Sequence, residues 1–153
     1  MAQSSKQWRR GRGKLGPLQP LLGSWVARAD TPMGPVECRR TFARVLGEKY
    51  VRLDAAWHFA KGVYQEVAYF RAGDDGALEF WSFTSDGKRS DGRAADASDV
   101  HASALAFEAH MPAGLARQVY WPAEDGGFHW AVESRSKKGW NRFVQHHYRP
   151  AST

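Results

Sequence analysis

The side chains best suited to binding or catalysis lie between Phe128 and Arg149, near the C-terminus. Arg142 and His146 are an even number of positions apart, so they face the same side of a β-strand. A guanidinium can hold a carboxylate through two parallel hydrogen bonds, and an imidazole can exchange a proton near neutral pH. This pair predicts either a site for a small acidic molecule or general acid–base chemistry.

The turn at 137–139 decides what lies beside these two side chains. A three-residue loop that ends in a left-handed Gly139 sets Trp130 opposite His146 and turns Arg142 to the same face. One face of the hairpin is then aromatic and the other charged, as a half-buried sheet requires. This register predicts that all three side chains project into the interior.

A second hairpin, around Ala60–Gly62, gives the opposite wall under the same reading. A three-residue loop places Trp57, Gln65 and Tyr69 on the inner face and turns Glu66 outward. Tyr69 and His146 are then the inward acid–base combination. The predicted ligand-binding residues are Trp57, Gln65, Tyr69, Trp130, Arg142 and His146.

Arg142 also has a structural explanation. An arginine at the end of a strand can stack on a tryptophan, Trp25 or Trp140, and close one end of the fold as a cation–π plug. Arg149 is the alternative plug. Both roles for Arg142 remain open at the level of sequence, as ligand anchor and as plug.

His146 has several possible roles. It could be a ligand donor, a haem ligand or a general base, or a hydrogen-bonded histidine of the core. No metal site is predicted, because no cysteine–histidine spacing fits zinc and the neighbours His146 and His147 point to opposite faces.

The elements that position these residues are short β-strands. From Trp25 onward, stretches of about 7–11 residues rich in Val, Tyr, Phe and Trp alternate with Gly- and Asp-containing turns such as Asp86-Gly87. About ten strands result, and a meander of this length must close on itself. The polar stretch Ala94–Ser103 could be a loop, and the inner set of the strand before Asp86 could be Leu78 and Phe80 or Trp81 and Phe83.

The predicted fold is therefore all-β, a single up-and-down antiparallel barrel of about ten strands. A short helical or 3₁₀ turn over Leu15–Leu22 precedes it. The chain has 153 residues, 42% of them hydrophobic, which is enough for one domain with a core. No apolar run approaches the roughly 20 residues that a membrane span needs. No secretory signal is expected, and the single Cys38 favours a core position in a cytoplasmic protein.

Positive charge concentrates at the N-terminus. The net charge is +6, and the first 14 residues hold five basic side chains and no acidic one. Removing these five leaves 17 basic against 16 acidic residues. Residues 1–16 are predicted to form a basic, disordered tail before a barrel domain over 17–150. Nucleic acid is not expected as a partner beyond non-specific contacts of this tail.

Four features carry a resemblance to a known group. They are Leu22-Gly23-Ser24-Trp25, the Thr31–Pro35 turn, the Asp86-Gly87 turn and the closing strand Trp140–Tyr148. Together they resemble the calycins, and more narrowly a bacterial family of uncharacterised lipocalin-like barrel domains. The similarity covers roughly residues 18–150. It implies a barrel with an interior cavity for a small apolar or amphipathic molecule, closed at one end by Trp25.

Two related groups of barrels differ from this sequence. Fatty-acid-binding proteins insert a helical lid between their first two strands, and Asp30–Pro35 is too short for one. Nitrobindins, which hold haem, extend the opening box with glycines where this chain has Ala27 and Ala29. Their haem-ligating histidine has a possible counterpart in His146 or His147.

These observations predict non-enzymatic binding or carriage of a small hydrophobic or amphipathic ligand in the barrel. No cofactor is expected unless the protein is a haem-binding barrel, which is the first alternative. A small barrel isomerase or cyclase is the second, so enzymatic activity remains open. The sequence does not predict an oligomeric state.

Overall fold

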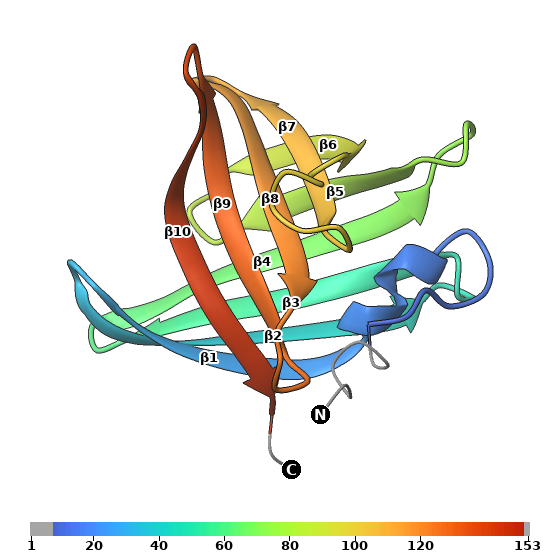
Figure 1. Cartoon of the computed structure of the whole chain (residues 1–153). Coiled ribbons are helices and arrows are strands. Elements are labelled where there is room, and N and C mark those ends of the chain that lie inside the picture. The colour runs from blue at the N-terminus through green and yellow to red at the C-terminus, as the bar shows by residue number, and fades with distance from the viewer. Residues whose placement is uncertain (1–7, 152–153) are drawn as a thin grey trace.

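The computed structural model describes residues 8–151, which form a closed barrel of ten antiparallel strands preceded by the 3₁₀ helix η1 (Gly16–Leu21). The predicted all-β fold and its short N-terminal helical turn are thereby confirmed (Figure 1). The strands are β1 (Gly23–Thr31), β2 (Gly34–Val45), β3 (Tyr50–Phe59), β4 (Gly62–Ala72), β5 (Leu78–Thr84), β6 (Arg89–Ala95), β7 (Leu105–Met111), β8 (Gly114–Pro122), β9 (Phe128–Ser136) and β10 (Gly139–Pro150).

Each strand pairs with its neighbours in sequence, and β10 returns to β1. Trp25 of β1 lies opposite Pro150, and Val26 lies opposite Arg149. These two pairs close the barrel near the start of β1, and the remaining residues of β1 and β10 do not pair with each other. No helix of residues 8–151 is long and apolar enough to cross a membrane.

The antiparallel order separates the connections into two groups. The hairpins β1–β2, β3–β4, β5–β6, β7–β8 and β9–β10 lie at one end, which we call the open end. The other connections lie at the opposite end together with η1, and we call it the η1 end. Figure 1 shows η1, in blue, beside the turn that joins β2 and β3.

The η1 end is sealed by apolar side chains. Leu15, Leu18 and Leu21 are buried, and the Trp25 indole donates a hydrogen bond to the Leu21 carbonyl oxygen at 2.7 Å. Trp8 likewise donates to the carbonyl oxygen of Ser103 at 2.9 Å. The predicted disordered tail extended to residue 16, but Trp8 and Leu15 pack against the barrel, whereas Arg9, Arg10, Arg12 and Lys14 between them are exposed. Residues 1–7 lie outside the described part.

A second, smaller core lies outside the barrel wall. The irregular segment 96–104 between β6 and β7 packs Ala97 and Val100 against Val119 of β8. The loop predicted around 94–103 is therefore present from residue 96. Buried Arg117 fastens this segment, since its Nη2 lies 2.7 Å from Asp99 Oδ2 and 2.7 Å from Glu133 Oε1.

The hairpin registers differ from the predicted ones by one residue. Phe59 pairs with Gly62 and Ser136 pairs with Gly139, so both turns contain two loop residues rather than three. Because side chains alternate along a strand, a shift of one position turns a whole set to the other face. The β5–β6 turn differs in the opposite direction. A two-residue turn at Asp86-Gly87 would pair Trp81 with Gly92, whereas Phe80 pairs with Gly92.

The registers of β5 and β10 determine which of their side chains point into the barrel. In β5, Leu78 and Phe80 are inside, and Phe83 is 48% exposed. In β10, a bulge between Arg142 and Val144 restores the predicted pairing of His146 with Trp130. The predictions for the C-terminal half of β10 are therefore confirmed, and those next to its turn are wrong.

Candidate functional site: the aromatic cavity at the open end

Two neighbouring cavities lie at the open end of the barrel, with volumes of about 310 and about 620 Å³. Volumes in this range are typical of sites for small molecules. Both cavities are lined by Trp57 of β3, Tyr64 of β4 and Trp130 of β9. The smaller cavity is also lined by Glu66, Phe80, Ser82, Phe107, Ala109 and Gln118, and the larger by Met33, Val36, Phe59, Val144 and His146.

The two tryptophans form the aromatic part of this site. The ring centroids of Trp57 and Trp130 are 6.4 Å apart, and Trp57 lies 5.5 Å from the ring of Tyr64. The Trp130 indole donates a hydrogen bond to Gln118 Oε1 at 3.0 Å, which holds the ring in place. Aromatic rings in this arrangement offer a large apolar contact area to a ligand.

Arg40 lies beneath the aromatic rings in the centre of the barrel. It is fully buried, and its guanidinium carbon is 4.2 Å from the centroid of the Trp130 ring. Its Nε donates to the Tyr148 hydroxyl at 3.1 Å and its Nη1 donates to the Tyr120 hydroxyl at 2.9 Å. Nη2 has no hydrogen-bond partner among the described residues.

The charge of Arg40 is retained despite its burial. Desolvation alone would lower the pKa of Arg40, but interactions with Tyr120, Tyr148 and Glu66 raise this pKa above its usual value. Burial also raises the pKa of Tyr120, so its hydroxyl stays protonated while Arg40 pulls in the other direction. The barrel therefore contains a permanent positive charge.

Sequence reasoning did not identify Arg40, although a signal was present. Val36, Cys38 and Phe42 alternate with outward residues in β2, and Arg40 occupies the inward position between them. An arginine in such an apolar series predicts a buried charge. Cys38 is also inside, as expected for a core residue, and burial raises its pKa to about 11.

Glu66 supplies a carboxylate to the cavity wall. It is 9% exposed, and its Oε2 accepts a hydrogen bond from the Ser82 hydroxyl at 2.5 Å. The prediction that Glu66 points outward is wrong, because Glu66 pairs with Ala55 across a two-residue turn and therefore shares the face of Trp57. Among the described residues, Arg40 and Glu66 form no direct ion pair.

His146 lies beside the larger cavity as a neutral imidazole. It is 8% exposed, and its ring centroid is 5.4 Å from that of Trp130. Burial, together with the charge of Arg40, lowers the pKa of His146 below its usual value. Its Nδ1 is buried and has no hydrogen-bond partner among residues 8–151.

Three of the six predicted ligand-binding residues are outside the barrel. Gln65 is exposed, and the Tyr69 hydroxyl accepts a hydrogen bond from Arg52 on the outer surface at 3.3 Å. Arg142 donates to Glu133 Oε2 at 2.8 Å, also on the outside. The one-residue shift at each turn accounts for all three placements, and it separates Tyr69 from His146. Trp57, Trp130 and His146 do meet at the cavity.

The predicted plug, an arginine from the closing strand stacked on Trp25, is not found among the described residues. Trp25 is partly buried against Phe128, with ring centroids 4.8 Å apart, and no arginine stacks on it. Arg149 is largely exposed and donates to Asp125 Oδ2 at 3.1 Å. The pairing of an arginine with Trp25 is therefore wrong for Arg142 and for Arg149. The arginine next to Trp25 in the sheet is Arg40, which lies opposite it on β2.

His147 faces away from the cavity. Its Nε2 lies 2.9 Å from Asp125 Oδ2, and its ring is 4.7 Å from that of His129 on the outer surface. Of the two histidines predicted as haem ligands, only His146 borders the cavity. Within residues 8–151, no cluster of three or more His, Cys, Asp or Glu side chains could hold a metal ion.

Comparisons with known proteins identify a fold and no family. No family model matches the chain, and no curated protein matches it. A solved structure, that of Rv2717c from M. tuberculosis, is similar with a TM-score of 0.60 and 16% sequence identity. The similarity covers 92% of this chain and 99% of that one. At this level of identity, the conclusion is that the chain shares the fold of Rv2717c.

Proposed function

We propose that this protein binds a small, mainly apolar molecule at the open end of the barrel. The observation that carries the proposal is an aromatic cavity with a carboxylate in its wall. Trp57, Tyr64 and Trp130 would cover the apolar part of the ligand. Glu66, with one oxygen already bonded to Ser82, would accept a hydrogen bond from the polar part.

The charge distribution favours a ligand that donates hydrogen bonds over an acidic one. A ligand carboxylate in the cavity would be repelled by Glu66. Two positive groups lie nearby. Arg40 is fully buried and does not line the cavity, and Arg117, which does, is already paired with Asp99 and Glu133. Gln118 uses its oxygen to accept from Trp130, which leaves its amide nitrogen as a donor for the ligand. The proposed ligand is therefore neutral, with at least one N–H or O–H group.

The proposal is tested by titration with N-phenyl-1-naphthylamine, a neutral fluorescent probe with one N–H donor. Ala109→Phe places a large side chain in the cavity and should weaken binding at least tenfold. Ala43→Phe adds the same side chain to the exposed outer face of β2 and should change the affinity less than twofold. Circular dichroism checks that both variants are folded.

Two results would overturn the proposal. One is an equal effect of Ala109→Phe and Ala43→Phe on the probe affinity, because the probe would then bind elsewhere. The other is the absence of saturable binding to the unmodified chain, together with native mass spectra that contain no co-purified small molecule.

Haem is a second candidate, favoured by His146. The neutral imidazole of His146 borders an apolar hollow of about 620 Å³, and because its Nδ1 is buried, Nε2 is the nitrogen that could bind an iron there. Trp130 and Val144 would pack against the macrocycle. Bound haem would supply an iron able to bind a small gas such as nitric oxide.

This candidate is tested by adding hemin and recording the Soret band. His146→Ala should abolish a sharp band, whereas His147→Ala should leave it unchanged because His147 lies outside the barrel. Loss of the band in both variants, or no band in the unmodified chain, would remove haem as a candidate.

A further inference from the structure

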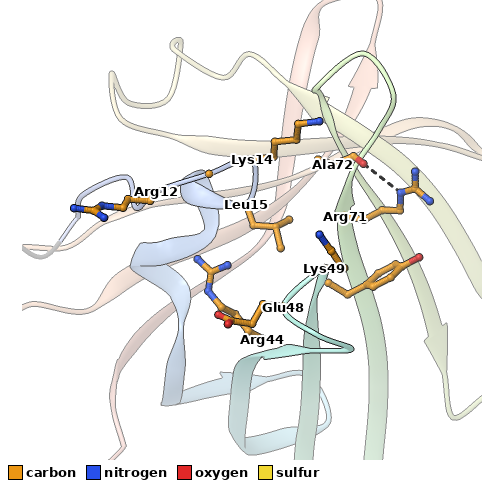
Figure 2. Close-up of a pocket in the computed structure, with 10 residues that line it drawn as sticks. Arg12, Lys14, Leu15, Arg44, Glu48, Lys49, Arg71 and Ala72 are labelled. Carbon is orange, nitrogen blue, oxygen red and sulfur yellow. Dashed lines mark hydrogen bonds between the residues drawn. The ribbon is translucent and has the colours of Figure 1, made fainter.

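A third hollow, of about 540 Å³, lies at the η1 end of the barrel, on the opposite side from the aromatic cavity. Three separate parts of the chain surround it, namely residues 12–15, the turn between β2 and β3, and the end of β4. Figure 2 shows Leu15 between the Arg44 and Lys49 side chains, with Arg12 and Arg71 directed away from it toward opposite sides. The basic residues that line it are Arg12, Lys14, Arg44, Lys49 and Arg71.

These positive charges are poorly neutralised. Glu48 is the one carboxylate of the lining, and Arg71 alone among the five lies near other carboxylates, at 3.8 Å from Asp74 and 4.0 Å from Glu79. Arg44 donates to a neutral group, the side-chain oxygen of Gln19, at 3.2 Å. The other three basic side chains form no ion pair within residues 8–151.

Elsewhere on the outer surface, several arginines form ion pairs with carboxylates. Arg28 and Arg39 both contact Glu37, and Arg52 contacts Asp54. Several like charges gathered around a concave surface raise the local positive potential, and a bound anion relieves their repulsion. The hollow therefore has the electrostatic character of an anion site.

The turn beside the hollow has an uncommon backbone. Leu46, Gly47 and Glu48 all have positive φ angles, of 54°, 66° and 64°. Two of the three are not glycine, and such residues are held in this conformation only by their surroundings. The sharp turn brings Arg44 and Lys49, from the ends of β2 and β3, to the same hollow.

We propose that this hollow binds a phosphorylated small molecule that carries two or more negative charges. One guanidinium group can bind a phosphate through two parallel hydrogen bonds, and a lysine ammonium group binds a phosphate as a point charge. Tyr50 and Leu15 add an aromatic ring and an apolar surface, so an organic phosphate fits better than a bare ion. The volume and concave shape favour a small molecule over a nucleic acid strand or a membrane surface.

The test is a calorimetric titration with inorganic tripolyphosphate. Lys14→Gln/Lys49→Gln removes two exposed charges that form no ion pair within residues 8–151, and should weaken binding at least tenfold. Lys137→Gln/Lys138→Gln removes the same charge from the β9–β10 turn, at the other end of the barrel. This control should change the affinity less than twofold.

Three outcomes would overturn the proposal. They are equal losses in the two double variants, no saturable binding to the unmodified chain, and binding only to oligouridylate or to vesicles of equal parts phosphatidylcholine and phosphatidylserine. Ala109→Phe, which fills the aromatic cavity, should leave tripolyphosphate binding unchanged. The two sites are thereby tested independently.

Discussion

Arg40 brings a positive charge into the middle of the barrel, and its neighbours offset the cost of burial. Two tyrosine hydroxyls accept its hydrogen bonds, and the Trp130 ring lies on one side of its guanidinium. Glu66 adds a longer-range attraction. An arginine held in this way stabilises the stack of aromatic rings above it, so it acts on the cavity without touching a ligand.

Replacing Arg40 should therefore destabilise the whole protein. Arg40→Gln leaves two buried hydroxyls without their donor and removes the contact with Trp130, which should lower the free energy of unfolding by about 2–4 kcal/mol. Arg89→Gln, on an exposed arginine, should change it by less than about 0.5 kcal/mol. Urea unfolding measures both. Equal stability of the two variants would contradict a structural role for Arg40.

At the scale of elements, the number of strands and their closure into a barrel could be predicted, and the inner faces near the turns could not. The reason is that a glycine at the end of a turn is compatible with two loop lengths. Gly139 has φ of 125°, and a glycine at positive φ fits both the last residue of a three-residue loop and the first strand residue after a two-residue turn. The sequence pattern is the same, but the register differs by one.

The bulge in β10 explains why part of the site was predicted correctly. It adds one residue to β10 between Arg142 and Val144, which reverses the error made at the turn. Trp130 and His146 lie beyond the bulge and were placed correctly. Arg142 lies before it and was not. Arg40 and Glu66 were missed for two reasons. Arg40 is a charged residue at an inward position of an otherwise apolar series in β2, and the predicted β3–β4 register was shifted by one residue.

Deleting Phe143 tests this register. Phe143 lies at the bulge and is 63% exposed, so its removal should give a continuous ladder with both halves of β10 unchanged. The variant should lose less than about 1 kcal/mol of stability. Deleting Thr41, an exposed residue of β2, should instead turn one half of that strand inside out and unfold the barrel, because β2 has no bulge to absorb the loss. Thermal unfolding compares the two. Similar melting temperatures for both deletions would contradict the observed register.

At the scale of the whole molecule, the two ends of the barrel differ in the side chains that fill or surround them. The η1 end is filled by leucines from the N-terminal segment, and the hollow beside it is basic. The open end keeps aromatic side chains around free space. Stability should therefore depend mainly on the η1 end, and the affinity for an apolar molecule should depend mainly on the open end.

Two truncations to alanine separate these properties. Leu18 is fully buried at the η1 end, so Leu18→Ala should lower the free energy of unfolding by about 2–5 kcal/mol and leave the affinity for N-phenyl-1-naphthylamine unchanged. Tyr64 already borders a cavity, so Tyr64→Ala creates little new unfilled space. Tyr64→Ala should lower the free energy of unfolding by less than Leu18→Ala does. It should weaken binding of the probe several-fold, because an aromatic contact is lost. Urea unfolding and fluorescence titration, made where both variants are folded, measure the two effects. If Leu18→Ala weakened binding of the probe as much as Tyr64→Ala, packing at the η1 end would control the shape of the open end. Stability and probe affinity would then not depend on different ends of the barrel.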